Sequence, residues 1–189
     1  MTSPLRSPAR PPTLADLAAL PSTVVGEILA GELVASPRPA SRHARSSAVL
    51  GGVLGGPFDF GGGGPGGWWI LDEPELHLGP DVVVPDLAGW RRSRMPAIPD
   101  TAAFELAPDW VCEVLSPSTL RHDKISKLAI YARERVPHYW MVHPVDRTLE
   151  VLRLDGAGYR LAGTWADDAK VRAEPFDAVE LDLGLLWIK

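Results

Sequence analysis

The stretch VCEVLSPST, residues 111–119, places a carboxylate inside an apolar strand directly before a helix start. Its first residues are typical of a buried β-strand, and the serine or threonine at its end can cap a helix predicted to run to about Arg135. Because side chains alternate along a strand, Glu113 shares a face with Val111 and Leu115. A buried carboxylate is costly unless it is paired, hydrogen-bonded or metal-bound. Glu113 is therefore a candidate site residue.

A second carboxylate, Asp86, follows the valines 82–84 and Pro85 near the end of a strand predicted over residues 81–87. Each acid taken alone could face solvent or pair with an arginine. Two carboxylates on adjacent apolar strands could instead hold a hard cation together, because Mg²⁺ prefers oxygen ligands at about 2.1 Å. The sequence thus predicts that Asp86 and Glu113 bind a metal.

The helix after residue 119 supplies candidate lysines, Lys124 and Lys127, and either could reach over the sheet toward the carboxylates. At ~100° per residue, Lys124 and Tyr131 fall on one flank of the apolar stripe and Lys127 lies at its border. Asp123 and Lys127 also form an i,i+4 pair, which alone could be surface charge stabilisation. The predicted stripe consists of Ile125, Leu128, Ala129 and Ala132.

The remaining pattern indicates a mixed β-sheet flanked by helices, an α+β or α/β fold. Thr13 caps a short helix that ends by Pro21, and Ala30-Gly31 joins a hairpin. Ser41 caps a helix to about Leu54, and a glycine-rich loop covers residues 55–67. Further strands are predicted over residues 24–29, 32–34, 68–72, 75–78, 109–115, 138–142, 148–154, 159–164 and 180–183.

The bulk composition predicts a disordered tail over residues 1–12 and one domain over residues 13–189. The net charge of −5 lowers the expectation of sequence-independent nucleic-acid binding without excluding it. One cysteine, no signal peptide and no run of ~20 apolar residues indicate a soluble cytoplasmic protein. Cys112 and the tryptophans 68, 69, 110, 140 and 187 are expected to fill the core.

Several motifs together resemble the Uma family, a set of small proteins placed among restriction-endonuclease-like proteins of the PD-(D/E)XK nuclease superfamily. The resemblance runs from about Leu14 to Leu186, and residues 113–119 followed by Asp123 and Lys127 are its most specific part. The other matching segments are 27–33, 84–86, Leu128, Tyr131 and 136–140.

This resemblance implies a mixed sheet with helices on both sides and a divalent metal on Asp86 and Glu113. The superfamily's usual lysine position is Leu115 here, so the resemblance passes the lysine role to Lys127. Glu75 matches a position where related proteins often carry an additional acid. The other interpretation of Glu75 is a solvent-facing strand residue.

The expected function is Mg²⁺-dependent hydrolysis of nucleic-acid phosphodiester bonds, with Mn²⁺ as an alternative ion and DNA as the expected substrate. The arginines 42, 45, 91, 92 and 94 could contact the backbone of the nucleic acid, although a solvated surface is the plainer interpretation. His43, His77 and His122 form no recognisable triad. Two other interpretations stay open: a nuclease fold that only binds or regulates, and a self-associating module, for which a homodimer is the commonest assembly.

Overall fold

The computed structural model describes residues 10–116 and 122–188, and its centre is a six-stranded mixed sheet in the order β10-β9-β8-β7-β6-β3. Only the pair β7–β8 in this sheet is parallel. The mixed sheet flanked by helices was predicted, and this prediction is confirmed. The strands are β3 (Trp68–Asp72), β6 (Leu87–Arg91), β7 (Trp110–Val114), β8 (His138–His143), β9 (Thr148–Asp155) and β10 (Gly158–Ala166).

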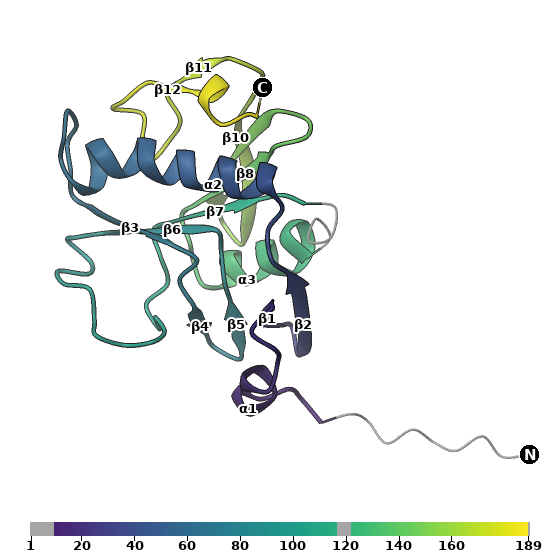
Figure 1. Cartoon of the computed structure of the whole chain (residues 1–189). Coiled ribbons are helices and arrows are strands. Elements are labelled where there is room, and N and C mark those ends of the chain that lie inside the picture. The colour runs from purple at the N-terminus through teal and green to yellow at the C-terminus, as the bar shows by residue number, and fades with distance from the viewer. Residues whose placement is uncertain (1–9, 117–121, 189) are drawn as a thin grey trace, which may run out of the picture.

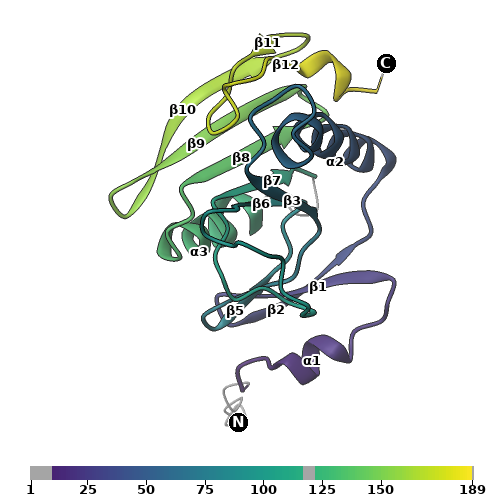
Figure 2. The ribbon, with the colours of Figure 1, turned by 90° about the vertical axis from the view of Figure 1, so that its left-hand side faces the viewer.

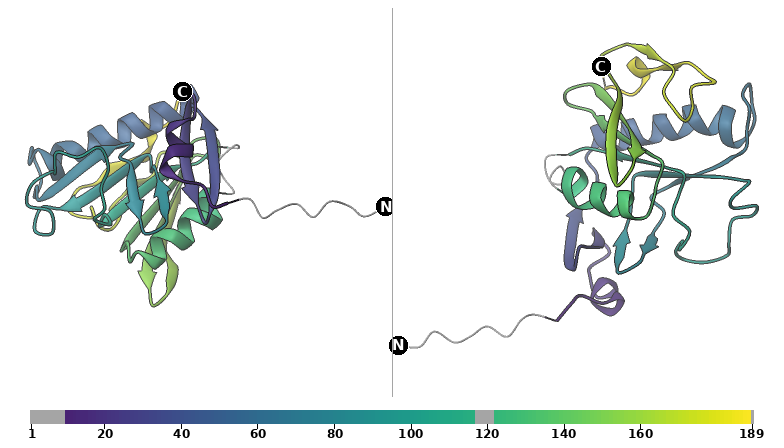
Figure 3. Two further views of the ribbon diagram at one scale, coloured as in Figure 1. Left: turned by 90° about the horizontal axis from the view of Figure 1, so that it is seen from below. Right: turned by 180° about the vertical axis from the view of Figure 1, so that it is seen from behind.

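A second sheet has the order β2-β1-β5-β4. Its strands are β1 (Val24–Leu29), β2 (Glu32–Pro37), β4 (Leu76–Leu78) and β5 (Asp81–Val83). Ala30 and Gly31 both have positive φ, 52° and 83°, as a two-residue type I′ hairpin requires. The short helix α1 (Leu14–Ala18) is capped by Thr13, as predicted. Together with this sheet, α1 lies at the end of the molecule opposite the C-terminal segment (Figure 3).

Helix α2 (Ser41–Leu54) covers one face of the six-stranded sheet (Figure 1). Its Leu50 and Leu54 join a core cluster that includes Trp110, Trp140 and Phe176. The C-terminal elements β11 (Lys170–Val171), β12 (Leu181–Asp182) and the 3₁₀ helix η3 (Leu183–Leu185) lie on the same side (Figure 2).

Two expectations about this helix were wrong in detail. Ala40, not Ser41, is the N-cap residue, and it makes no side-chain cap. The first five residues of the glycine-rich segment are not a loop, because they form the π-helical turn η1 (Gly55–Asp59). The reason in the sequence is Phe58: its side chain is buried against Phe176, and this burial holds the turn against the end of the helix.

The other face of the sheet is covered by η2 (His122–Lys127) and α3 (Leu128–Arg133). The predicted apolar stripe is confirmed at Ala132, which is buried, and at Leu128, which packs against the core, but it was wrong at Ala129 and at Ile125, which is 61% exposed. Lys127, Ile130 and Tyr131 are buried instead. The reason is that η2 is a π-helix, whose wider turns rotate side chains away from the α-helical spacing. The predicted cap at residues 118 and 119 lies outside the described residues.

The single strand predicted over residues 81–87 is two strands in different sheets, β5 and β6. Val84, Pro85 and Asp86 connect them. Proline has no N–H to give to a ladder, which favours a break at this point. Asp86 therefore lies at the junction between the two sheets, a position that alternation along one strand does not describe.

Cys112, Trp68, Trp110, Trp140 and Trp187 are all buried, which confirms the predicted core role. Trp69 is half-buried, and its indole lies under the guanidinium of Arg92 at 3.7 Å. Within the described part of the chain, no helix is long and apolar enough to cross a membrane.

Candidate active site

A cavity of about 290 Å³ opens where the small sheet meets β7, η2 and the first turn of α2. We call it the site cavity. Both predicted metal ligands, Asp86 and Glu113, line it together with Lys127. Its other lining residues are Val25, Glu27, Ser36, Pro37, Arg38, Pro39, Ala40, His43, Glu73, Val84 and Ser116.

Glu113 lies in the middle of β7 and is 2% exposed. Its Oε2 accepts a hydrogen bond from Lys127 Nζ at 3.0 Å, and its Oε1 accepts one from the Tyr131 hydroxyl at 2.8 Å. Burial, and then the charge of Glu113, raise the pKa of Tyr131 well above its usual range, so the phenol remains a donor. A buried carboxylate is thus held by two donors from the helix above it, which offsets its desolvation.

Asp86 is held from β7 and from α2. Its Oδ2 accepts a hydrogen bond from the Val114 amide at 2.6 Å, and its Oδ1 lies 3.1 Å from His43 Nε2. Because Val114 directly follows Glu113, this bond ties Asp86 to the strand that carries Glu113. His43 was one of three histidines that form no recognisable triad in the sequence, and their scatter provided no signal for this contact.

The sequence also missed Glu27, which is 4% exposed on β1. Its Oε1 lies 3.0 Å from Lys127 Nζ and accepts a hydrogen bond from the Val84 amide at 2.8 Å. The signal that identified Glu113, a carboxylate inside an apolar strand, was present here too. The hairpin pattern drew attention to the turn instead.

Lys127 is the lysine that reaches the carboxylates, and Lys124 is exposed. The three donors of the Lys127 ammonium have three acceptors within reach: Glu27, Glu113 and the Val84 carbonyl, the last at 3.2 Å. Lys127 is 4% exposed, although helical spacing predicted it at the border of the apolar stripe. The π-helical turn described above carries it inward.

Glu75 does not line the site cavity. It lies beside α1, where its carboxylate contacts His77 Nε2 at 2.7 Å. Glu73 occupies the position opposite Asp86 because the chain turns after β3: Glu73 has φ 44°, and its amide donates to the Asp86 carbonyl at 3.1 Å. Burial, and then the charges of Asp72 and Asp86, raise the pKa of Glu73.

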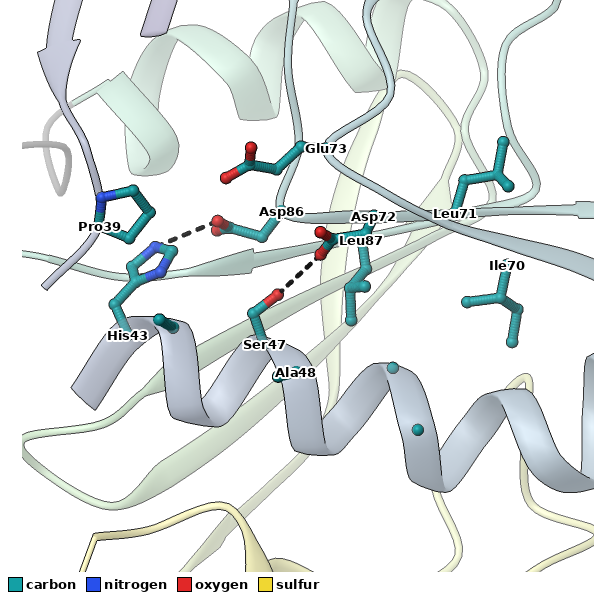
Figure 4. A pocket seen from close by; sticks show the side chains of 13 residues that line it. Pro39, His43, Ser47, Ala48, Ile70, Leu71, Asp72, Glu73, Asp86 and Leu87 are labelled. Atoms are coloured by element: carbon teal, nitrogen blue, oxygen red, sulfur yellow. Dashed lines mark hydrogen bonds and ion pairs between the residues drawn. The ribbon is translucent and has the colours of Figure 1, made fainter. Parts of the chain in front are cut away.

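A second hollow of about 340 Å³ lies on the far side of the His43–Asp86 contact, between α2 and β3 (Figure 4). We call it the α2 cavity. Ser47 faces Asp72 across it at 3.4 Å, and Glu73 lies above Asp86. The two cavities share Pro39, His43, Glu73 and Asp86.

The arginines after β6 are engaged within the protein. Arg92 donates to Asp59 at 2.8 Å, and Arg94 donates to Asp109 at 2.8 Å. Arg91 is exposed, and its guanidinium lies 4.5 Å from the Trp68 ring centroid. These contacts favour a structural role for Arg92 and Arg94.

The donors around the site cavity fit a hard divalent cation. Asp86 and Glu113 offer carboxylate oxygens, the lining holds more acidic than basic side chains, and each carboxylate oxygen has more than one lone pair. Among the described residues, no three His, Cys, Asp or Glu side chains form a complete cage. Mg²⁺ needs none, because it is usually bound through one or two carboxylates together with waters and substrate phosphates.

The sequence matches the model of the Uma2 family, described as "Putative restriction endonuclease", over residues 14–184. No curated protein matches. A crystal structure from Anabaena variabilis ATCC 29413, described as "a putative nuclease belonging to DUF820", is similar with a TM-score of 0.75 and 22% sequence identity. The similarity covers 93% of this chain and 97% of that chain, and it identifies the fold as restriction-endonuclease-like. The family description supports a nuclease. Because the match covers most of the chain, the protein belongs to the Uma2 family of restriction-endonuclease-like proteins.

Proposed function

We propose that this protein is a Mg²⁺-dependent endonuclease that hydrolyses nucleic-acid phosphodiester bonds, with DNA as the expected substrate. The observation that carries the proposal is the buried contact of Lys127 with Glu113, which is 3.0 Å long. Asp86 lines the same cavity and accepts a hydrogen bond from the amide of Val114, the residue after Glu113 on β7. Acids and a buried lysine that converge on one cavity are typical of catalytic sites.

Asp86 and Glu113 would hold the ion, with the Val114 carbonyl nearby. Bound Mg²⁺ would polarise the scissile phosphodiester and lower the pKa of a water. Lys127 would position that water or stabilise the negative charge that develops on the phosphate oxygens. The Tyr131 hydroxyl and the Val114 amide would keep the two carboxylates in place without ordering them anew at each turnover.

The test is calorimetric titration of the protein with Mg²⁺ and with Mn²⁺, using wild type, Asp86→Ala and Glu113→Ala. Binding that is lost in both variants supports the site and justifies a cleavage screen over single- and double-stranded DNA and RNA. Glu105→Gln is the matched control, because Glu105 is exposed and lies outside both cavities. Full metal-dependent cleavage by Asp86→Ala would contradict the proposal.

A second candidate function is a nuclease fold that binds or regulates without cutting. The hydrogen bonds from Lys127 and Tyr131 to Glu113 favour this alternative, because each oxygen of the carboxylate already has a partner without a metal. Metal binding without cleavage of any substrate would support this alternative, and absence of metal binding in wild type would exclude the Mg²⁺ site.

A homodimer remains a prediction, which sedimentation equilibrium would test.

A further inference from the structure

Two buried carboxylates share one buried ammonium at the edge of the site cavity. Glu27, Glu113 and Lys127 are 4%, 2% and 4% exposed, and Lys127 Nζ lies 3.0 Å from an oxygen of each acid. With one positive and two negative charges, the group carries one unit of negative charge in a place with little access to water. Buried net charge is unfavourable unless another charge compensates it.

Glu27 belongs to a different part of the fold from the other two residues. It comes from β1 in the small sheet, whereas Glu113 lies on β7 in the large sheet and Lys127 ends η2. The same Glu27 oxygen accepts from the Val84 amide at 2.8 Å, two residues before Asp86. Glu27 therefore contacts both the lysine and the segment that carries the second proposed metal ligand.

We infer that Glu27 is a positioning residue that sets the charge of the metal site: by sharing Lys127, it leaves Glu113 negative enough to attract a divalent cation. Without Glu27, the full charge of Lys127 falls on Glu113, and the pair becomes neutral. This inference rests on the proposed function, because it concerns the same ion. It also gives the small sheet a part in the site, since β1 supplies a charge that the large sheet lacks.

The charge argument predicts an order of Mn²⁺ affinities that a purely structural role does not. Glu27→Gln removes one negative charge and should weaken Mn²⁺ binding on the order of tenfold, since unit charges a few ångström apart interact strongly away from bulk water. Glu27→Gln combined with Lys127→Met restores one unit of negative charge and should recover most of that affinity. Glu27→Asp keeps the charge and should bind Mn²⁺ about as tightly as wild type.

The experiment is calorimetric titration with Mn²⁺, with a thermal melt of each variant to establish that it is folded. Glu32→Gln, on the exposed end of the same hairpin, is the matched control. If the double variant does not fold, the comparison of Glu27→Gln with Glu27→Asp decides, because only the first changes the charge.

Weakened binding in Glu27→Gln, with recovery in the double variant or retention in Glu27→Asp, supports the inference. Unchanged binding in Glu27→Gln overturns it and leaves the proposed metal site standing. Equal weakening in Glu27→Gln and Glu27→Asp also overturns it, because shape rather than charge would then matter. Absence of Mn²⁺ binding in wild type would overturn the proposed metal site and this inference together.

Discussion

The two faces of β7 carry opposite kinds of side chain. Trp110, Cys112 and Val114 face α2 and belong to an apolar core cluster. On the other face, Glu113 lies between Val111 and Leu115, under Lys127 and Tyr131. One face of β7 thus stabilises the sheet through apolar contacts, while the other face holds the charged carboxylate of Glu113 where an apolar side chain could have packed. Substitutions on the two faces should therefore separate stability from metal binding.

The largest effect on stability is expected on the apolar face. Trp110→Ala should lower the free energy of unfolding by ~4 kcal/mol, because it removes a fully buried ring that packs edge-on against Trp140 and Phe176. Urea denaturation measures this loss. The folded fraction of the variant should still bind Mn²⁺ with near wild-type affinity. A large loss of affinity in the folded fraction would break the separation of the two faces.

On the charged face, Lys127→Met should lower the free energy of unfolding by ~3 kcal/mol, because it leaves Glu27 and Glu113 buried without their shared counter-ion. The triple variant Glu27→Gln, Glu113→Gln and Lys127→Met removes all three charges and should regain most of that stability. Urea denaturation of both proteins makes the comparison. A triple variant as unstable as Lys127→Met would mean that the lysine stabilises through packing.

Alkaline pH should lower the free energy of unfolding through Cys112, the thiol on the apolar face of β7. Burial raises the pKa of Cys112 well above its usual range, with smaller contributions from Asp86 and Glu113. Because the thiol loses its proton more easily in the unfolded protein, its high pKa in the folded state stabilises the fold fully at pH values below about 8.5, the ordinary pKa of a thiol. This stability is lost as the pH rises above that value. The expected slope is about 1.4 kcal/mol per pH unit.

Cys112→Ala should remove this slope, which urea midpoints measured from neutral pH to about pH 10 would show. Tyr131 begins to contribute only at higher pH, because the ordinary pKa of a phenol is about 10. A thiol reagent should label wild-type Cys112 no faster than the protein unfolds. An unchanged slope in Cys112→Ala would assign the alkaline loss to other groups.

The smallest effect is expected at Glu75, which lies away from both faces of β7 and contacts His77 beside α1. Glu75→Gln should change the free energy of unfolding by no more than about 0.5 kcal/mol, as is usual for a half-exposed side chain. Its Mn²⁺ affinity should equal that of wild type. Weaker Mn²⁺ binding in this variant would restore Glu75 as a member of the site.

The sequence by itself determined the mixed fold, the buried strand around Glu113 and the two acids that meet at the site cavity. Each of these depends on local signals: alternation, and a carboxylate where apolar residues are expected. Only the tertiary structure decided which other side chains join them. Glu27 and His43 come from segments remote in sequence, and the choices of Glu73 over Glu75 and of Lys127 over Lys124 depend on a backbone turn and a π-helical segment. Such contacts are set by how two sheets and two helices pack, which no local pattern along the chain encodes.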